Sequence, residues 1–515
     1  MTDGVVVIGA GVGGLVSAAL LAARGHAVTV VEAQPAPGGK LRALDVGGAA
    51  IDAGPTVFTM REVFEEIFAQ CGDRLDRHLT MHPATTLARH AWGAARLDLF
   101  ADASASEQAI GAFAGAADAR GYRAFRAEAK RLFDALDRPF LRDTRPDPFT
   151  LGWRMGARGL ADYCTLRPYT SLWRALGGYF RDPRLRQLFG RYATYCGSSP
   201  FACPATLMLI AHVEASGVWL IDGGMHRLAR ALEALGRLHG VRFRYATPVR
   251  EILVEHHRAA GVVLAGGERL AAASVICNAD PAAIAAGRFG AGVRRAVSAV
   301  PAARRSLSAM VWTGHASASG FPLARHTVFF APDYPAEFAA LAAGRLADAP
   351  SVYVCAQDRD APGGPRDGAE RVQIIVNAPP RGDAGFTQEE IAACTKRMLD
   401  GVSRAGLSLD LEPSTIVTTP DDFETLCPST GGALYGPASH GWAASFRRQG
   451  SRTRIAGLYC AGGSTHPGAG VPMAALSGRL AVACLERDRV STSVSMPAAM
   501  PGGMSTRPAR TVRTG

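Results

Sequence analysis

The chain has 515 residues, of which 48% are hydrophobic and 20% are charged, a balance typical of a large globular protein with a substantial core. No stretch of about eighteen residues is both apolar and free of charge, which argues against a membrane-spanning helix. The formal net charge is +11, yet no basic run is interleaved with aromatic residues, so we do not expect nucleic-acid binding.

A nucleotide-binding turn is indicated at the start of the chain. The β-branched residues 5–8 predict a buried parallel strand, and a glycine-rich turn into a helix over residues 15–24 follows them. Gly9, Gly11 and Gly14 have the spacing that lets a pyrophosphate approach the helix N-terminus. Since the first strand begins almost at Met1, we expect no signal peptide.

An acidic residue completes this unit. Residues 27–31 predict a second strand, and Glu32 stands at its carboxyl end. A carboxylate in this place accepts hydrogen bonds from an adenosine ribose. The order of strand, glycine turn, helix, strand and acid therefore predicts a dinucleotide site.

The rest of the chain alternates between helical and β patterns. Residues 86–215 have a helical pattern, and the short β-like runs within 241–277 predict a return to the nucleotide-binding part. Strands are predicted at 351–356 and 371–377, with a helix after Thr387. From residue 491 the polar, charge-poor composition predicts a disordered tail.

The segment after Glu32 resembles the flavoproteins with two dinucleotide-binding domains. In that family a Gly-Gly-Arg segment follows the ribose-binding acid, and here Gly38, Gly39 and Lys40 occupy the corresponding positions. The resemblance implies FAD as the cofactor. Lysine replaces the usual arginine, so either Lys40 or Arg42 is expected to face a phosphate.

A second motif, near the carboxyl end, points to a narrower family. Residues 458–473 predict another strand, glycine-rich turn and helix, and the sequence THPGAGVP within them resembles the final motif of carotenoid desaturases of the bacterial phytoene desaturase type. Further motifs of that family stand at 53–57, 222–225, 434–436 and 445–448. The likeness covers about residues 4–487. It is strongest to the hydroxyneurosporene, or 1-hydroxycarotenoid 3,4-, desaturases, through residues 58–61, 88–92 and 462–464.

The resemblance implies an α/β fold of interleaved parts. A Rossmann-like FAD-binding domain, similar to that of amine oxidases and desaturases, is expected to combine with a mixed α+β substrate domain and a helical, membrane-facing insertion. The expected segments are 1–85, 216–289 and 436–490 for FAD, 86–215 for the insertion, 290–435 for the substrate and 491–515 for the tail.

The implied reaction removes two hydrogens from adjacent carbons and introduces a 3,4 double bond into a 1-hydroxylated acyclic carotenoid. Electrons would pass through FAD to oxygen or to a membrane quinone. A cytoplasmic protein peripherally bound to the inner photosynthetic membrane is expected, because such a carotenoid dissolves only in a bilayer. The candidate apolar membrane patch comprises Phe140, Leu141, Leu151, Trp153, Trp173 and Phe180.

The resemblance also assigns site residues. His466 is the candidate for proton handling, with a loop-shaping role as the alternative. Asp52 and His226 are expected to position loops, and no metal site is predicted at the His256–His257 pair. The predicted cofactor contacts are Gly9, Gly11, Gly14, Glu32, Gly39, Lys40, Val249, Gly462, Gly463, Val471, Pro472 and Met473.

Other functions remain open at this point. A phytoene desaturase and a carotene isomerase are compatible with the same motifs, whereas an amine oxidase with an aromatic cage fits the final motif least. A non-catalytic isoprenoid carrier on the same fold is the alternative from a different class. The intact Gly9, Gly11, Gly14 and Glu32 argue against a carrier, because a chain without FAD has no need of them.

Overall fold

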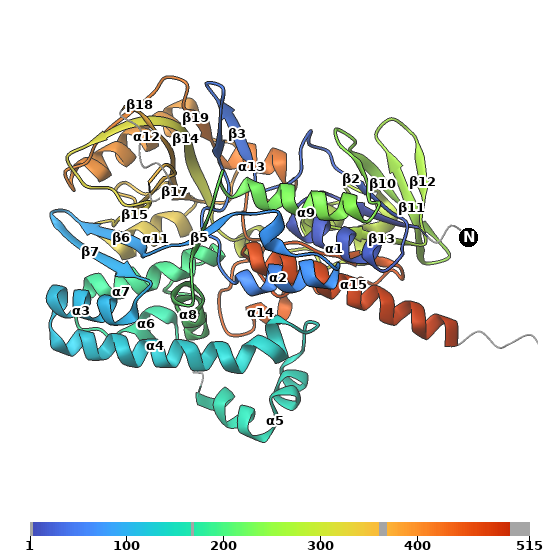
Figure 1. Ribbon diagram of the computed structural model, residues 1–515, viewed down its shortest axis with the longest axis horizontal. Coiled ribbons are helices and arrows are strands. Elements are labelled where there is room, and N and C mark those ends of the chain that lie inside the picture. Colours follow the sequence, from blue (N-terminus) through green and yellow to red (C-terminus); the bar gives the residue numbers. More distant parts are fainter. Residues whose placement is uncertain (1–3, 166–168, 360–367, 495–515) are drawn as a thin grey trace, which may run out of the picture.

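A five-stranded parallel sheet forms one end of the molecule (Figure 1). The computed structural model describes residues 4–165, 169–359 and 368–494. Strands from distant parts of the chain meet in this sheet. Their order is β20 (Leu458–Cys460), β13 (Ser274–Cys277), β1 (Val5–Ile8), β2 (Val28–Val31) and β9 (Arg242–Arg244).

The central strand β1 is buried on both faces. Val5 and Val7 belong to a core shared with helices, while Val6 and Ile8 point into a second core on the opposite face. The helices of the first core are α1 (Val12–Ala23), α2 (Arg61–Gln70), α9 (His226–Leu238) and α15 (Val471–Val494). The second core contains α10 (Pro281–Ala286) and the sheet of β10 (Val249–Glu255), β11 (Arg258–Leu264) and β12 (Arg269–Ala271).

An eight-stranded sheet forms the other half. Helix α12 (Gln388–Ser403) packs on one face around Trp312 and Met398. Its strands, in order, are β18 (Ser408–Leu411), β14 (Ser308–Ser319), β17 (Glu370–Ala378), β16 (Val352–Ala356), β15 (His326–Phe329), β6 (Thr86–Trp92) and β7 (Ala95–Phe100), and β19 (Ile416–Thr418) pairs with β14.

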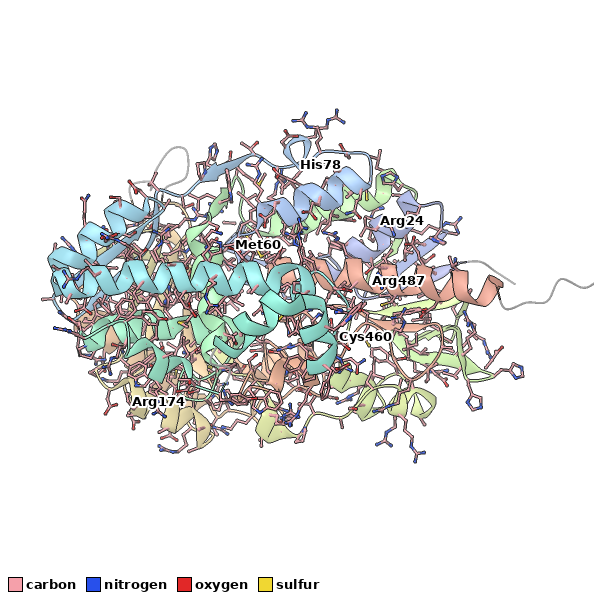
Figure 2. The ribbon with its side chains drawn as sticks, turned by 90° about the horizontal axis from the view of Figure 1, so that it is seen from below. Arg24, Met60, His78, Arg174, Cys460 and Arg487 are labelled. Carbon is pink, nitrogen blue, oxygen red and sulfur yellow. The ribbon has the colours of Figure 1, made fainter. Side chains whose placement is uncertain are left out.

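Helices cover the opposite face of this sheet, and the long α4 crosses the molecule in the view from below (Figure 2). They are α3 (Ala103–Ala114), α4 (Ala116–Leu136), α6 (Leu172–Leu176), α7 (Pro183–Gly190), α8 (Leu209–Ala215) and α11 (Tyr334–Ala342), while α5 (Pro148–Thr165) packs against the end of α4. Helix α5 stands off from the body at the bottom of Figure 1. In the described part of the chain, no helix has the length and apolar character needed to cross a membrane.

Shorter elements complete the chain. Two small sheets pair β3 (Ala43–Val46) with β4 (Ala49–Asp52) and β5 (Met81–Pro83) with β8 (Trp219–Ile221). Two further helices are α13 (Pro420–Leu426) and α14 (Ala444–Arg447). The short 3-10 helices are η1 (Leu75–Arg77), η3 (Arg191–Cys196), η4 (Ala205–Met208), η5 (Ala291–Ala296) and η6 (Ala302–Arg304), and η2 (Asp137–Leu141) is a turn of π-helix.

Most predicted elements are confirmed. The first strand and turn appear as β1 and α1, and Gly25, with φ of +87°, follows the end of that helix. Asp280 caps α10 through its side chain with Pro281 at the first helical position, and Thr387 caps α12 in a capping box. Strands β16 and β17 and helix α12 lie where the pattern predicts them.

The prediction that residues 86–215 are helical throughout is wrong at its start. Residues 86–100 form the hairpin β6–β7, which turns at Gly93. The inner neighbour of β6 in the sheet is β15, so Arg89 pairs with Thr327, which lies far away in the sequence. Local sequence does not encode such a distant partner, and the alanine-rich composition of the hairpin suggested a helix.

The predicted tail lies almost entirely outside the described residues. Its first four residues, 491–494, instead continue α15. The predicted domain limits are not tested by this topology and stay predictions, although β1, β9, β13 and β20 of the expected FAD segments do share one sheet.

Candidate active site

A cavity of about 880 Å³ lies between the two halves of the molecule. One wall consists of the glycine turns at the carboxyl ends of β1, β13 and β20, where parallel strands place ligand-binding loops. The opposite wall consists of β14–β17 and of the helices around α5 and α8. Met60, labelled in Figure 2, lines it from the start of α2 with φ of 50°, a left-handed conformation that costs a non-glycine residue about 1–2 kcal/mol.

The first glycine turn is packed too tightly for any side chain. A Cβ on Gly14 would come 2.1 Å from the carbonyl oxygen of Gly9, so strand and helix pack closely only without one. A Cβ on Gly11 would lie 2.6 Å from the amide nitrogen of Asn278. Helix α1 begins with neither a side-chain cap nor an acidic residue, which leaves its positive end to a phosphate.

The Glu32 carboxylate lies beside this turn and is 8% exposed. It accepts hydrogen bonds from the backbone N–H groups of Ala10 (2.6 Å) and Gln34 (2.8 Å), and the residue lines the cavity. These bonds hold the acid at the end of β2 in the place where a ribose reaches it. Val249, another predicted cofactor contact, also lines the cavity.

Lys40 is engaged with the protein itself. Its Nζ donates to the carbonyl oxygen of Leu434 at 2.7 Å, although the residue lines the cavity. Arg42 contacts Thr418 and the ring of Phe423 and is not part of the cavity lining in the described residues. The charge of Lys40 therefore joins two loops, and its predicted phosphate contact stays a prediction.

The second glycine turn faces the first. Gly462 has φ of +112°, and a Cβ on Gly13 would lie 2.8 Å from its backbone nitrogen. Gly39, Gly462, Gly463, Val471, Pro472 and Met473 all line the cavity, as do Gly9 and Gly11. Two helix N-termini, a buried carboxylate and an open channel between them fit FAD. Gly14, which was also predicted as a cofactor contact, does not line the cavity and serves the helix packing instead.

Asn278 is a site residue that is not among the cofactor contacts predicted from the sequence. It lines the cavity at the end of β13, between Gly11, Gly13 and Gly462. Its Oδ1 is buried and has no hydrogen-bond partner among the described residues. A buried acceptor without a partner is costly, so this oxygen is available to a donor on the cofactor.

The substrate side of the cavity is largely apolar. Its side chains come from η2 and α5, from α8 and η4, and from the face of the eight-stranded sheet. They include Leu136, Phe140, Leu141, Leu151, Leu207, Leu209, Ile210, Val213, Val311, Val328, Phe330 and Ile375. A cavity with such walls suits a hydrocarbon chain.

A buried ionic cluster interrupts this apolar wall. Arg191 is 7% exposed, and its guanidinium lies 4.0 Å from the carboxylate of Glu214. Glu214 in turn accepts hydrogen bonds from the hydroxyl groups of Tyr192 and Tyr195. The opposite charges of Arg191 and Glu214 offset one another, whereas Nε and Nη2 of the arginine have no hydrogen-bond partner in the described part of the chain.

Arg448 is buried on the flavin-motif side. It is 4% exposed and donates to the carbonyl oxygens of Tyr435, Pro437 and Gly463 at 2.8–3.2 Å. Burial lowers the pKa of Arg448, since no carboxylate bonds to it directly. Its hydrogen bonds fasten the loop before α14 to the second glycine turn.

His466 lies behind the cavity wall. Among the described residues the lining includes Pro467 to Met473 but not His466. Its Nε2 donates to the carbonyl oxygens of Phe140 (2.8 Å) and Asp143 (2.9 Å), and its Nδ1 is buried without a partner. Burial lowers the pKa of His466 to about 4. This geometry favours the loop-shaping role, and the proton-handling role stays a prediction.

Asp52 and His226 join the flavin-side loops. The Asp52 carboxylate accepts from the backbone nitrogens of Met225 and His226 and so caps the start of α9. Burial raises the pKa of Asp52 against these hydrogen bonds. His226 contacts the carbonyl oxygen of Pro37, beside Gly38. The His256–His257 pair is exposed in the β10–β11 turn, as predicted.

Acidification is expected to weaken the fold through His466. Its pKa is about 4 in the folded protein and about 6.5 in an unfolded chain. Between these values the unfolded state binds more protons, so the free energy of unfolding decreases as the pH falls. Urea unfolding across this window should show a smaller pH dependence for His466→Gln, which keeps an N–H donor, than for the wild type. The exposed His257→Gln should behave as the wild type, and parallel curves for all three proteins would contradict this account.

Comparison with known proteins assigns the chain to a family. The family described as flavin containing amine oxidoreductase matches residues 12–485. A hydroxyneurosporene desaturase of Rubrivivax gelatinosus is 51% identical over 99% of this chain and 98% of its own length. That of Cereibacter sphaeroides is 48% identical over 95% and 98%, respectively. A 1-hydroxycarotenoid 3,4-desaturase of a Flavobacterium species is more distant, at 28% identity over 92% and 96%.

Solved structures agree on the fold. An oxidoreductase from Methanosarcina mazei superposes with a TM-score of 0.56 at 17% identity, over 92% of this chain and 98% of its own. Putrescine oxidase bound to putrescine gives 0.56 at 15% identity, over 96% and 99%. At such identities the likeness shows the fold alone. The sequence relatives and the cavity together show that the chain belongs to the flavin containing amine oxidoreductases, as an FAD-dependent oxidoreductase of the carotenoid desaturase family.

Proposed function

We propose that the protein introduces the 3,4 double bond into 1-hydroxylated acyclic carotenoids of the 1-hydroxyneurosporene type. The observation that carries this proposal is a single cavity with glycine turns and Glu32 on one side and an apolar wall on the other. The names of the similar desaturases support the same substrate class. A phytoene desaturase or a carotene isomerase would use the same cavity. The phytoene desaturase is distinguished by its substrate, and the isomerase by the absence of net oxidation.

The chain's own residues bind, orient and enclose the reactants. FAD, when bound, takes up the two electrons that leave with the two hydrogens, and oxygen or a membrane quinone removes them. The turn at Gly11 and Gly13, at the N-terminus of α1, would hold the pyrophosphate, and Glu32 would accept hydrogen bonds from the ribose. The Oδ1 of Asn278 would accept from a donor elsewhere on the cofactor. The apolar wall keeps the polyene extended and excludes water, so position and dryness supply most of the rate acceleration.

The substrate reaches this cavity from a bilayer, through the surface around α5. Phe149 and Trp153 of α5 are 89% and 84% exposed, and Leu151 of the same helix lines the cavity. Trp442, 40% exposed, also lines the cavity and contacts Tyr169. Of the residues predicted for the patch, Trp153 alone is well exposed. Phe140, Leu141, Leu151 and Phe180 are buried and Trp173 is half-buried, because they pack against the core.

Removal of the two exposed α5 rings is expected to weaken membrane binding. The change Phe149→Ser with Trp153→Ser removes side chains that are each worth about 1.5–3 kcal/mol when buried in lipid, so binding should fall at least about tenfold. Co-sedimentation with anionic phospholipid vesicles measures this. Leu238→Ser is the matched control, since Leu238 is 66% exposed on α9 away from the cavity. Equal binding of both variants would contradict the assignment of this surface.

Loss of the Glu32 carboxylate is expected to weaken FAD binding. In Glu32→Ala the N–H groups of Ala10 and Gln34 lose their acceptor, and so does the ribose, which should raise the dissociation constant of FAD at least about tenfold. Titration of the apoprotein by flavin fluorescence measures it. The exposed Glu255→Ala is the control, and an unchanged FAD affinity for Glu32→Ala would contradict the predicted site.

The function itself is tested with the purified, FAD-loaded protein, a quinone and two carotenoids, 1-hydroxyneurosporene and phytoene. Conversion of 1-hydroxyneurosporene to a product with one more conjugated double bond, found by chromatography and absorption, is the expected result. Conversion of phytoene alone would assign the phytoene branch. Isomerisation without consumption of the quinone would indicate an isomerase, and carotenoid binding by a protein that retains no FAD would indicate a carrier.

A further inference from the structure

A glutamine with a free acceptor lies on the apolar wall of the cavity. Gln373 of β17 is 1% exposed and lines the cavity. Its Nε2 donates to the carbonyl oxygen of Gly54 at 3.1 Å, whereas its Oε1 is buried with no partner in the described part of the chain. An unpaired buried acceptor costs about 1–3 kcal/mol, so a donor on a bound ligand would recover this energy.

A chain of hydroxyl groups stands beside it. Thr56 Oγ1 and the Tyr353 hydroxyl are 2.6 Å apart, and that hydroxyl lies 2.8 Å from Nδ1 of His326. Thr56 and Tyr353 both line the cavity. Burial lowers the pKa of His326 to about 3, so the chain carries no charge at neutral pH. Each hydroxyl can donate as well as accept.

The strand register brings these groups together. Cys355 pairs with Gln373, and Tyr353 pairs with Ile375, so Tyr353 and Gln373 are diagonal neighbours on the same face of the sheet. Gly54, which receives the hydrogen bond of Gln373, is two residues before Thr56 in the chain. The unpaired acceptor and the hydroxyl pair therefore border the same part of the cavity.

We propose that Gln373, Thr56 and Tyr353 form a subsite for the hydroxyl end group of the carotenoid. The Gln373 Oε1 accepts a hydrogen bond from the carotenoid hydroxyl, and the Thr56–Tyr353 pair donates one to the hydroxyl oxygen. The inference rests on the proposed function and adds the residues that determine its specificity. These three are specificity-determining residues, because a substrate without the hydroxyl would leave Gln373 unpaired.

The position of the subsite suits the chemistry. The hydroxyl stands on C1, only two carbons from the C3–C4 bond that is oxidised, so its binding group must lie near the FAD side of the cavity. Segment 53–57 lines the cavity and directly follows Asp52, which bonds to the start of α9 on that side. Gln373 contacts that segment directly at Gly54. The subsite is also neutral, which avoids opposing the positive charge that develops on the polyene as hydride leaves. Arg191, by contrast, is charged and already paired with Glu214.

The test compares two carotenoids that differ only in the hydroxyl group. Binding of 1-hydroxyneurosporene and of neurosporene to the full-length protein with pre-reduced FAD is followed by quenching of tryptophan fluorescence, so that no turnover occurs. The wild type should bind the hydroxylated form at least about tenfold more tightly, and Thr56→Val and Gln373→Leu should each reduce this ratio about tenfold. Thr56→Ser should restore the ratio, and Tyr353→Phe should have an intermediate effect.

The controls separate specificity from folding and from the proposed reaction. Every variant must retain FAD. Thr425→Val, at an exposed threonine of α13, is the control that shows how a threonine-to-valine change affects binding by itself. The subsite would be overturned if the variants lost affinity for both carotenoids equally. It would also be overturned if the wild type bound the hydroxylated and the unhydroxylated carotenoid with equal affinity. Tight, selective binding without turnover by the oxidised enzyme would leave the subsite standing and contradict the proposed function instead.

Discussion

The close approach of three backbone segments around Asn278 is the constraint on which the cavity depends. The turns after β1 and β20 lie against this side chain so closely that a Cβ on Gly11 or Gly13 would come within 2.8 Å of it. Such packing requires the carboxyl ends of β1, β13 and β20 to be neighbours in one parallel sheet. It also opens two helix N-termini, those of α1 and α15, toward the same space.

Hydrogen bonds from the loops on the FAD side of the cavity to the substrate side fix the two cavity walls relative to each other. His466 holds the carbonyl oxygens of η2, Lys40 holds that of Leu434, and Arg448 joins the loop at 435–437 to Gly463. Gln357 exchanges two hydrogen bonds with the backbone of Asp52 at 2.9–3.1 Å. Lys40 and His466, which were predicted to contact a phosphate and to handle a proton, therefore serve first to position the loops.

Local features of the sequence were predictable because local rules govern them. The turn at Gly9–Gly14, the acid Glu32 and the helix start after Thr387 depend on residues a few positions apart, and all of them appear where they were predicted. The pairing of β6 with β15 joins strands that are hundreds of residues apart in the sequence. The hydrogen bond that places Gln373 near Thr56 also joins segments that are hundreds of residues apart. No local pattern carries that information, and a buried glutamine in a β-strand gives no sequence signal of its own. The ring of His466 is directed away from the cavity because it bonds to a backbone carbonyl of η2. Only the fold reveals this contact.

The division of the cavity into a polar, glycine-lined side and a dry, apolar side connects the fold to the chemistry. An enclosed apolar wall near the flavin suits a substrate whose own conjugation spreads charge, and it leaves the protein little acid–base work. The central claim is that one cavity brings FAD and a hydroxylated carotenoid together. Anaerobic mixing of the FAD-loaded protein with 1-hydroxyneurosporene, without any other acceptor, tests it most directly. We predict stoichiometric bleaching of the flavin with a red shift of the polyene spectrum at the same rate; a flavin that stays oxidised while the carotenoid is bound would contradict the account.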